Sequence, residues 1–133
     1  MKHLYMLDTD ICSYVIKGTY PALNAKIKAN KNRICMSSIT LAELLFGAKK
    51  KKSIRLMTSI EFFQQLVEVI PWGEEAAKRY AEIRDALECS GTPIGNMDML
   101  IAAVAAAHGL CLVTNNSAHF SRVPGLKSEN WME

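Results

Sequence analysis

The sequence has few of the features that mark exported, membrane-bound or zinc-binding proteins. No run among its 133 residues reaches the roughly 18 apolar residues that a membrane-spanning helix needs, and the N-terminus lacks the pattern of an export signal. The four cysteines form no C-x-x-C pair, and the three histidines show no ligand spacing. We therefore expect reduced thiols, no zinc site and a cytoplasmic location.

The composition is that of one folded domain. Half of the residues are hydrophobic and 22% are charged, so the chain is too apolar to be disordered. Its length is enough for one hydrophobic core and leaves no room for a second. We expect a single domain over residues 1–133.

Acidic residues are scarce in the first half of the chain. Ten basic residues stand between positions 11 and 60 against a single acid, Glu43, whereas positions 61–98 hold eight acids and three bases. A basic half favours a polyanionic partner such as nucleic acid. A solvated loop explains the lysine run alone equally well, so RNA binding by that run is the weakest part of the prediction. Its members are Lys49, Lys50, Lys51 and Lys52.

Short apolar runs alternate with segments of helical periodicity. This alternation is typical of an α/β domain with a central parallel sheet of four to five strands and helices on both faces, a three-layer arrangement. Strands are predicted over residues 4–7, 33–38, 67–72 and 111–114, with a short one in the C-terminal tail, and helices over 9–17, 21–29, 39–48, 53–67, 74–89 and 97–108.

Each acid near these strands has an ordinary interpretation of its own. The stretch LYMLDTD carries Asp8 directly after the first strand, and Asp10 suits the N-cap of the following helix. Asp98 opens a later helix, where the helix dipole stabilises an acid, and Glu43 fits a solvent-facing helical position.

Taken together, the acids predict a metal site. Ligands of parallel sheets bind beyond the carboxyl ends of the strands, where Asp8, Glu43 and Asp98 are expected to meet, with Asn116 just after the 111–114 strand. Two unit charges about 4 Å apart repel by roughly 4 kcal/mol at an effective dielectric of 20. The cluster must therefore bind protons, a basic side chain or a metal. Oxygen ligands without histidine or cysteine favour Mg²⁺ or Mn²⁺, which typically bridge to phosphate.

Four motifs follow one another along the chain: MLDTDICSYVIKG, SSITLAELLFGA, GTPIGNMDMLIAA and LVTNNSAHFSRVPGLKSENW. In this order they resemble the PIN-domain toxins of bacterial toxin–antitoxin pairs, the VapC ribonucleases, and especially their enterobacterial-type branch. The resemblance implies a PIN-like fold, a Mg²⁺- or Mn²⁺-dependent endoribonuclease, and metal ligation by Asp8, Glu43 and Asp98. Thr9 and Ser38 fall where relatives carry small hydroxyl residues beside the site.

The same resemblance implies a biological role. It predicts cleavage of initiator tRNA in the anticodon loop, which arrests translation, together with a homodimer. It also predicts a cognate VapB antitoxin whose tail occupies the acidic groove and inserts a basic side chain.

Three positions depart from the family pattern. Many PIN domains have a fourth acid where this chain has Asn116, and an amide positions water without supplying charge. Asp10 stands where relatives often have Asn, and either restores some of that charge or caps the helix. His119 replaces an acid before Phe120 and is expected at the surface.

Three other functions compete with this prediction. A haloacid dehalogenase-type phosphatase also begins with Asp-x-Asp after a strand, but it expects Thr or Val where this chain has Cys12. A PIN nuclease acting on another RNA or on DNA is a closer rival. The third is a non-catalytic module whose acidic groove binds a partner's arginines, and this alternative predicts tight protein binding without metal-dependent cleavage.

Overall fold

A computed structural model describes residues 3–133 and contains a five-stranded sheet in which every pairing is parallel. The strand order is β3-β2-β1-β4-β5. Strands β1 and β4 therefore lie side by side although they are far apart in the chain. The strands are β1 (Tyr5–Leu7), β2 (Ile34–Ser37), β3 (Glu68–Ile70), β4 (Cys111–Val113) and β5 (Ser128–Glu129).

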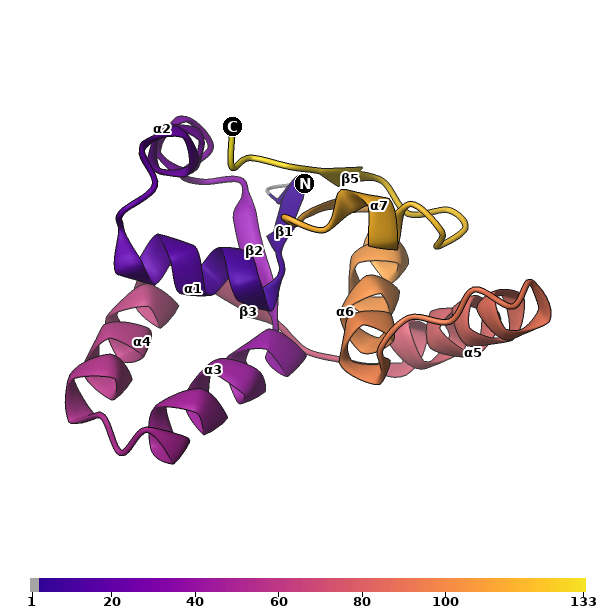
Figure 1. Ribbon diagram of the computed structural model, residues 1–133, viewed down its shortest axis with the longest axis horizontal. Coiled ribbons are helices and arrows are strands. Elements are labelled where there is room, and N and C mark those ends of the chain that lie inside the picture. Colours follow the sequence, from indigo (N-terminus) through magenta and orange to yellow (C-terminus); the bar gives the residue numbers. More distant parts are fainter. Residues whose placement is uncertain (1–2) are drawn as a thin grey trace.

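Helices cover both faces of the sheet, which confirms the predicted three-layer α/β architecture (Figure 1). One face carries the first four helices, and the other carries α5 and α6. The helices are α1 (Thr9–Lys17), α2 (Pro21–Ala29), α3 (Ser38–Lys50), α4 (Ile54–Leu66), α5 (Glu74–Cys89), α6 (Asn96–Ala107) and α7 (Ser117–Phe120).

The two hydrophobic cores follow from the alternation of side chains along the strands. In β1, Met6 packs into the core under α5 and α6, whereas Leu7 packs into the core under the first four helices. In β4, Leu112 packs into the core under α5 and α6, and Val113 packs into the core under the first four helices. Because both central strands are apolar on both faces, they run as continuous hydrophobic segments straight into the polar residues that follow them.

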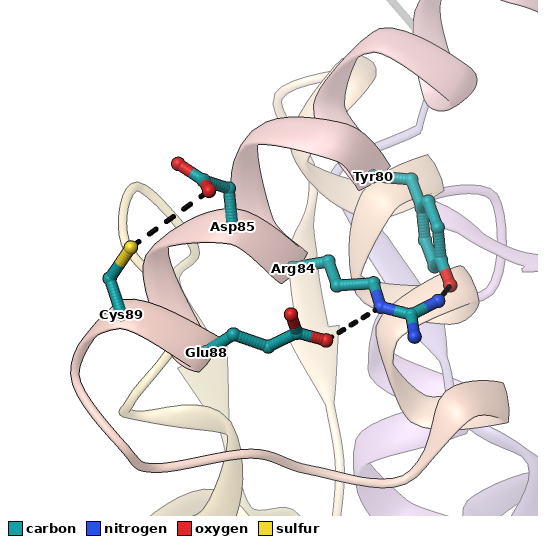
Figure 2. Close-up of polar contacts among 5 residues, drawn as sticks. All are labelled: Tyr80, Arg84, Asp85, Glu88 and Cys89. Atoms are coloured by element: carbon teal, nitrogen blue, oxygen red, sulfur yellow. Dashed lines mark hydrogen bonds and ion pairs between the residues drawn. The ribbon is translucent and has the colours of Figure 1, made fainter.

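Helix α5 packs into the core through Ala76, Ile83 and Leu87, and its exposed face carries local side-chain contacts. Arg84 donates to Glu88 Oε2 at 2.9 Å and to the Tyr80 hydroxyl at 2.9 Å, both four residues away (Figure 2). Cys89 is exposed and lies 3.9 Å from Asp85 Oδ1, while Cys12 and Cys35 are buried. All four cysteines are free. Among residues 3–133, no helix combines the length and apolarity needed to cross a bilayer.

Candidate active site at the carboxyl ends of β1 and β4

The acids gather where the strand order changes direction. From β1 the chain builds the sheet outward through β2 and β3, and it later returns to the other side of β1 with β4 and β5. Such a switch point leaves a crevice at the carboxyl ends of the two central strands. Asp8 directly follows β1 and Thr114 directly follows β4, and both are buried.

Asp8 is fixed by its backbone and by its carboxylate. Its N–H donates to the Val113 carbonyl at 3.0 Å, which continues the pairing of β1 with β4. Its carboxylate caps α1 by accepting the Ile11 N–H at 2.9 Å. The prediction that Asp10 caps this helix is therefore wrong: Asp10 is the second residue of α1 and is exposed, because the chain turns helical directly after Asp8.

Burial raises the pKa of Asp8 from 3.8 to about 6. The negative charges of Asp10 and Asp98 contribute to this rise of the pKa, whereas hydrogen bonds from Thr114 and from the Ile11 N–H oppose it. The Asp8 carboxylate is thus held in a place that disfavours its charge unless a cation is near. Asp98 is one of its electrostatic neighbours, as predicted from their positions after β1 and at the start of α6.

Glu43 is half-buried and accepts a hydrogen bond from a hydroxyl group. Thr9 donates to Glu43 Oε1 at 2.5 Å, and its hydroxyl lies 3.2 Å from that of Thr40. Thr40 in turn lies 3.3 Å from the Ser37 hydroxyl, which accepts the Thr40 N–H and caps α3. The chain of hydroxyls joins the start of α1 to the start of α3, so it fixes Glu43 relative to Asp8.

Ser38, predicted beside the site together with Thr9, makes a different contact. Its hydroxyl accepts the Trp72 N–H at 3.1 Å and ties α3 to the segment after β3. The hydroxyl groups that join Thr9 are those of Ser37 and Thr40. Ser37 is the last residue of β2. A polar residue at the end of an apolar strand was the sequence signal that could have predicted its place in the site.

Asp98 lies in the first turn of α6 and contacts a histidine. His119 Nε2 is 3.2 Å from Asp98 Oδ2, with 23% of the histidine side chain and 40% of the aspartate side chain exposed. The prediction of a plain surface position for His119 is wrong, because α7 returns over the site and brings the ring to Asp98. The sequence carries no periodicity that would reveal a four-residue helix such as α7.

Asn116 begins α7 and lies at the same edge of the sheet. Its N–H donates to the Thr114 hydroxyl at 3.0 Å, which links the start of α7 to the residue that hydrogen-bonds Asp8. Its side chain is exposed. Thr114, a buried hydroxyl that links these two residues, was missed from the sequence because threonine in an apolar run suggests only a strand residue.

The donor set suits a hard cation with few protein ligands. Within residues 3–133, no three His, Cys, Asp or Glu side chains lie close enough to form a complete metal cage. Mg²⁺ typically takes one or two carboxylates and completes its shell with water and substrate phosphate. Asp8 and Asp98, which are electrostatic neighbours, can supply two carboxylates. Glu43 contacts Thr9 and forms no three-acid group with them, so the predicted meeting of all three acids is not seen within residues 3–133.

The lysine run lies at the far end of α3 from the site. All four lysines are exposed, and Lys51 follows the last helical residue. They begin six residues after Glu43, which at 1.5 Å per helical residue is about 9 Å along the axis.

Comparison with known proteins identifies the family of the chain. The PIN domain family model matches residues 5–126. The chain belongs to the PIN-domain family. The tRNA(fMet)-specific endonuclease VapC of Shigella flexneri is 38% identical over 128 residues, spanning 96% of this chain and 97% of the relative. Ribonuclease VapC2 of Rickettsia felis is 41% identical over 131 residues, spanning 96% and 98%.

A solved structure supports the same assignment. The PIN-domain fold of this chain matches that of DNA-bound VapBC from Salmonella typhimurium with a TM-score of 0.90 and 39% identity, over 97% of this chain and 98% of the other. Likeness at this level over the full length places the chain in the VapC branch of PIN domains, as its four motifs predicted.

Proposed function

We propose that this PIN domain is the toxin of a VapBC-type pair and a metal-dependent endoribonuclease that cuts tRNA(fMet) in its anticodon loop. The observation that carries the proposal is the buried Asp8 at the switch point of the sheet, where its charge is disfavoured and Asp98 is an electrostatic neighbour. Full-length likeness to a tRNA(fMet)-specific endonuclease supports the substrate. Such an enzyme acts where tRNA is found, in the cytoplasm.

Asp8 and Asp98 would hold Mg²⁺ or Mn²⁺ directly, and Glu43 would bind through water. The ion, when bound, supplies positive charge to the scissile phosphate and activates water for attack. Asp8 is suited to this task because burial makes its lone charge unfavourable. Thr9 orients the Glu43 carboxylate by donating to it, and Glu43 can then accept a proton from water.

Asn116 and His119 complete the edge of the site. His119 contacts Asp98 and limits the orientations of that carboxylate. Asn116 opens α7, the helix that positions His119, and Asp10 adds negative charge next to Asp8. These three residues are supporting groups in the proposal.

The antitoxin partner has a surface that fits it. A pocket of about 500 Å³ lies between α1, α2 and α4, where Leu66 is 61% exposed and Val15 and Ile27 line the wall. Phe62 is 63% exposed on the same helix as Leu66. Amphipathic helices bind such grooves through their apolar face. We propose that a VapB-type antitoxin covers this groove and places a basic side chain at the acids; the homodimer stays a prediction.

The proposal is tested by incubating purified protein, free of antitoxin, with total tRNA and Mg²⁺ or Mn²⁺. Discrete cuts in one tRNA are expected, and they should disappear with EDTA and in Asp8→Ala. Titration of Mn²⁺ followed calorimetrically gives a second readout, with binding expected for wild type and lost in Asp8→Ala. Metal binding without cleavage of any RNA would favour the non-catalytic binding module.

A further inference from the structure

A second pocket adjoins the acids between α1 and α3. Its volume is about 150 Å³, and Thr9 and Glu43 form the end nearest the active site. Its apolar lining includes Ile16, Leu44 and Ile60. None of the functions assigned so far uses this pocket.

The two helices face each other across the pocket with matching rows of residues. On α1 the row is Thr9, Ser13 and Lys17, at intervals of four residues. The row from α3 holds Glu43 and Gly47, with Lys51 at the same interval just past the last helical residue. Residues four apart lie on the same face of a helix, so each row runs from the active-site end to a lysine.

Both lysines line the pocket from the helix ends that lie away from Thr9 and Glu43, and both are free to bind an anion. Among residues 3–133, neither Lys17 nor Lys51 forms an ion pair with a carboxylate. Eight residues of helix span about 12 Å, so the lysines lie well beyond the acids that would act on the scissile phosphate. An RNA strand that leaves the active site along this pocket would bring a later phosphate to them.

Gly47 keeps the middle of the pocket open. A Cβ built at this position meets nothing within 4 Å, so no neighbouring atom requires glycine there. Glycine inside a helix destabilises it by roughly 0.5–1 kcal/mol relative to alanine. The sequence thus carries a destabilising residue on the pocket-lining face of α3, between Glu43 and Lys51, where a side chain would narrow the pocket.

We propose that this pocket is an RNA subsite in which Lys17 and Lys51 bind a backbone phosphate downstream or upstream of the cut, with the attached nucleotide over Gly47. The inference rests on the proposed ribonuclease function. It assigns substrate positioning to two lysines, Lys17 at the end of α1 and Lys51 at the end of α3. It also gives Lys51 a role that the other lysines of the run, which lie outside the pocket, do not have.

The test measures binding of a short fluorescent single-stranded RNA without divalent metal, over a series of salt concentrations. Each phosphate contact in a single strand contributes about 0.7 to the slope of log K against log salt. Lys17→Gln and Lys51→Gln should each reduce the slope, and the double variant should reduce it by about that amount in total, because the two lysines share one phosphate. Each single variant should also raise the KM for tRNA cleavage severalfold. Lys50→Gln, an exposed lysine outside the pocket, is the matched control and should change neither value.

A second pair of variants changes shape without charge. Gly47→Gln should weaken RNA binding severalfold while raising the melting temperature, because it fills the pocket and removes a helical glycine. Ala42→Gln places the same side chain on an exposed position of α3 outside the pocket and should leave binding unchanged. A neutral methylphosphonate, moved one linkage at a time, should weaken wild-type binding at one position and have no effect there in Lys51→Gln.

Equal losses of RNA binding in Lys50→Gln and Lys51→Gln would overturn the subsite, because they indicate diffuse electrostatic attraction. Wild-type RNA binding by Gly47→Gln would also overturn it. Lysines that serve an acidic peptide instead would give this second result. If wild-type protein neither bound nor cut RNA, the proposed function would fail as well. Wild-type activity with unaffected variants would refute the subsite alone.

Discussion

Replacing Asp8 by Asn should stabilise the protein in a manner that depends on pH. The folded-state pKa of Asp8 is about 6 against 3.8 for an unperturbed carboxyl, because the side chain is buried. Between these two values the native state holds a proton that the unfolded state has released. The free energy of unfolding of the wild type therefore falls as the pH rises through this window and is lowest above pH 6.

The size of the effect follows from the shift. At 1.36 kcal/mol per pKa unit, ionised Asp8 costs about 3 kcal/mol of stability as an upper value. Asn carries no charge and caps a helix as well as Asp does, so Asp8→Asn keeps the contact to Ile11. The stability advantage of the variant should then grow by about 1–3 kcal/mol between pH 4 and pH 7.5.

Urea unfolding at four pH values across this range, with metal removed, measures the difference. Asp10→Asn is the control, since Asp10 is exposed on the same helix and its replacement should change stability by less than about 0.5 kcal/mol. A difference between wild type and Asp8→Asn that stays constant with pH would refute the reasoning, because an unburied Asp8 would then have an ordinary pKa.

Two further substitutions test the groups that position the acids. Thr9→Val removes the hydrogen-bond donor to Glu43 and should slow cleavage about tenfold at saturating RNA. Thr9→Ser keeps the hydroxyl and should retain most of the rate. Equal rates in the two variants would contradict the positioning role of Thr9. His119→Ala frees Asp98 and should lower the cleavage rate severalfold, while the free energy of unfolding changes by less than about 1 kcal/mol. His119→Gln keeps a hydrogen-bond donor and should restore the cleavage rate. Similar loss in His119→Ala and His119→Gln would show that contact with Asp98 is not what matters.

Local signals in the sequence predicted the fold well where they were strong. The bounds of α1 and α2 came out as predicted, because Gly18 ends the first helix in the left-handed conformation and Pro21 begins the second. Helix α5 also matched, since its apolar positions recur over sixteen residues. Helix α7 was missed because four residues carry no usable period.

In the candidate site, too, some features were predictable and others were not. The electrostatic proximity of Asp8 and Asp98 was predictable, because both residues flank strongly apolar segments. The hydroxyl chain through Thr40 depends on how α1 and α3 lie across β1 and β2, and the sequence does not encode that approach locally. The contact between His119 and Asp98 joins residues on two different helices and appears only once α7 is placed.

The most direct test of the central claim compares cleavage of purified initiator tRNA with that of an elongator tRNA in the presence of Mg²⁺. Wild type and Asp98→Asn should be assayed side by side, with fragment ends mapped. We expect one cut in the anticodon loop of the initiator tRNA, at a kcat/KM well above that for the elongator, and no cut by Asp98→Asn. Equal cleavage by the two proteins, or an initiator tRNA left intact by an active wild type, would contradict the account.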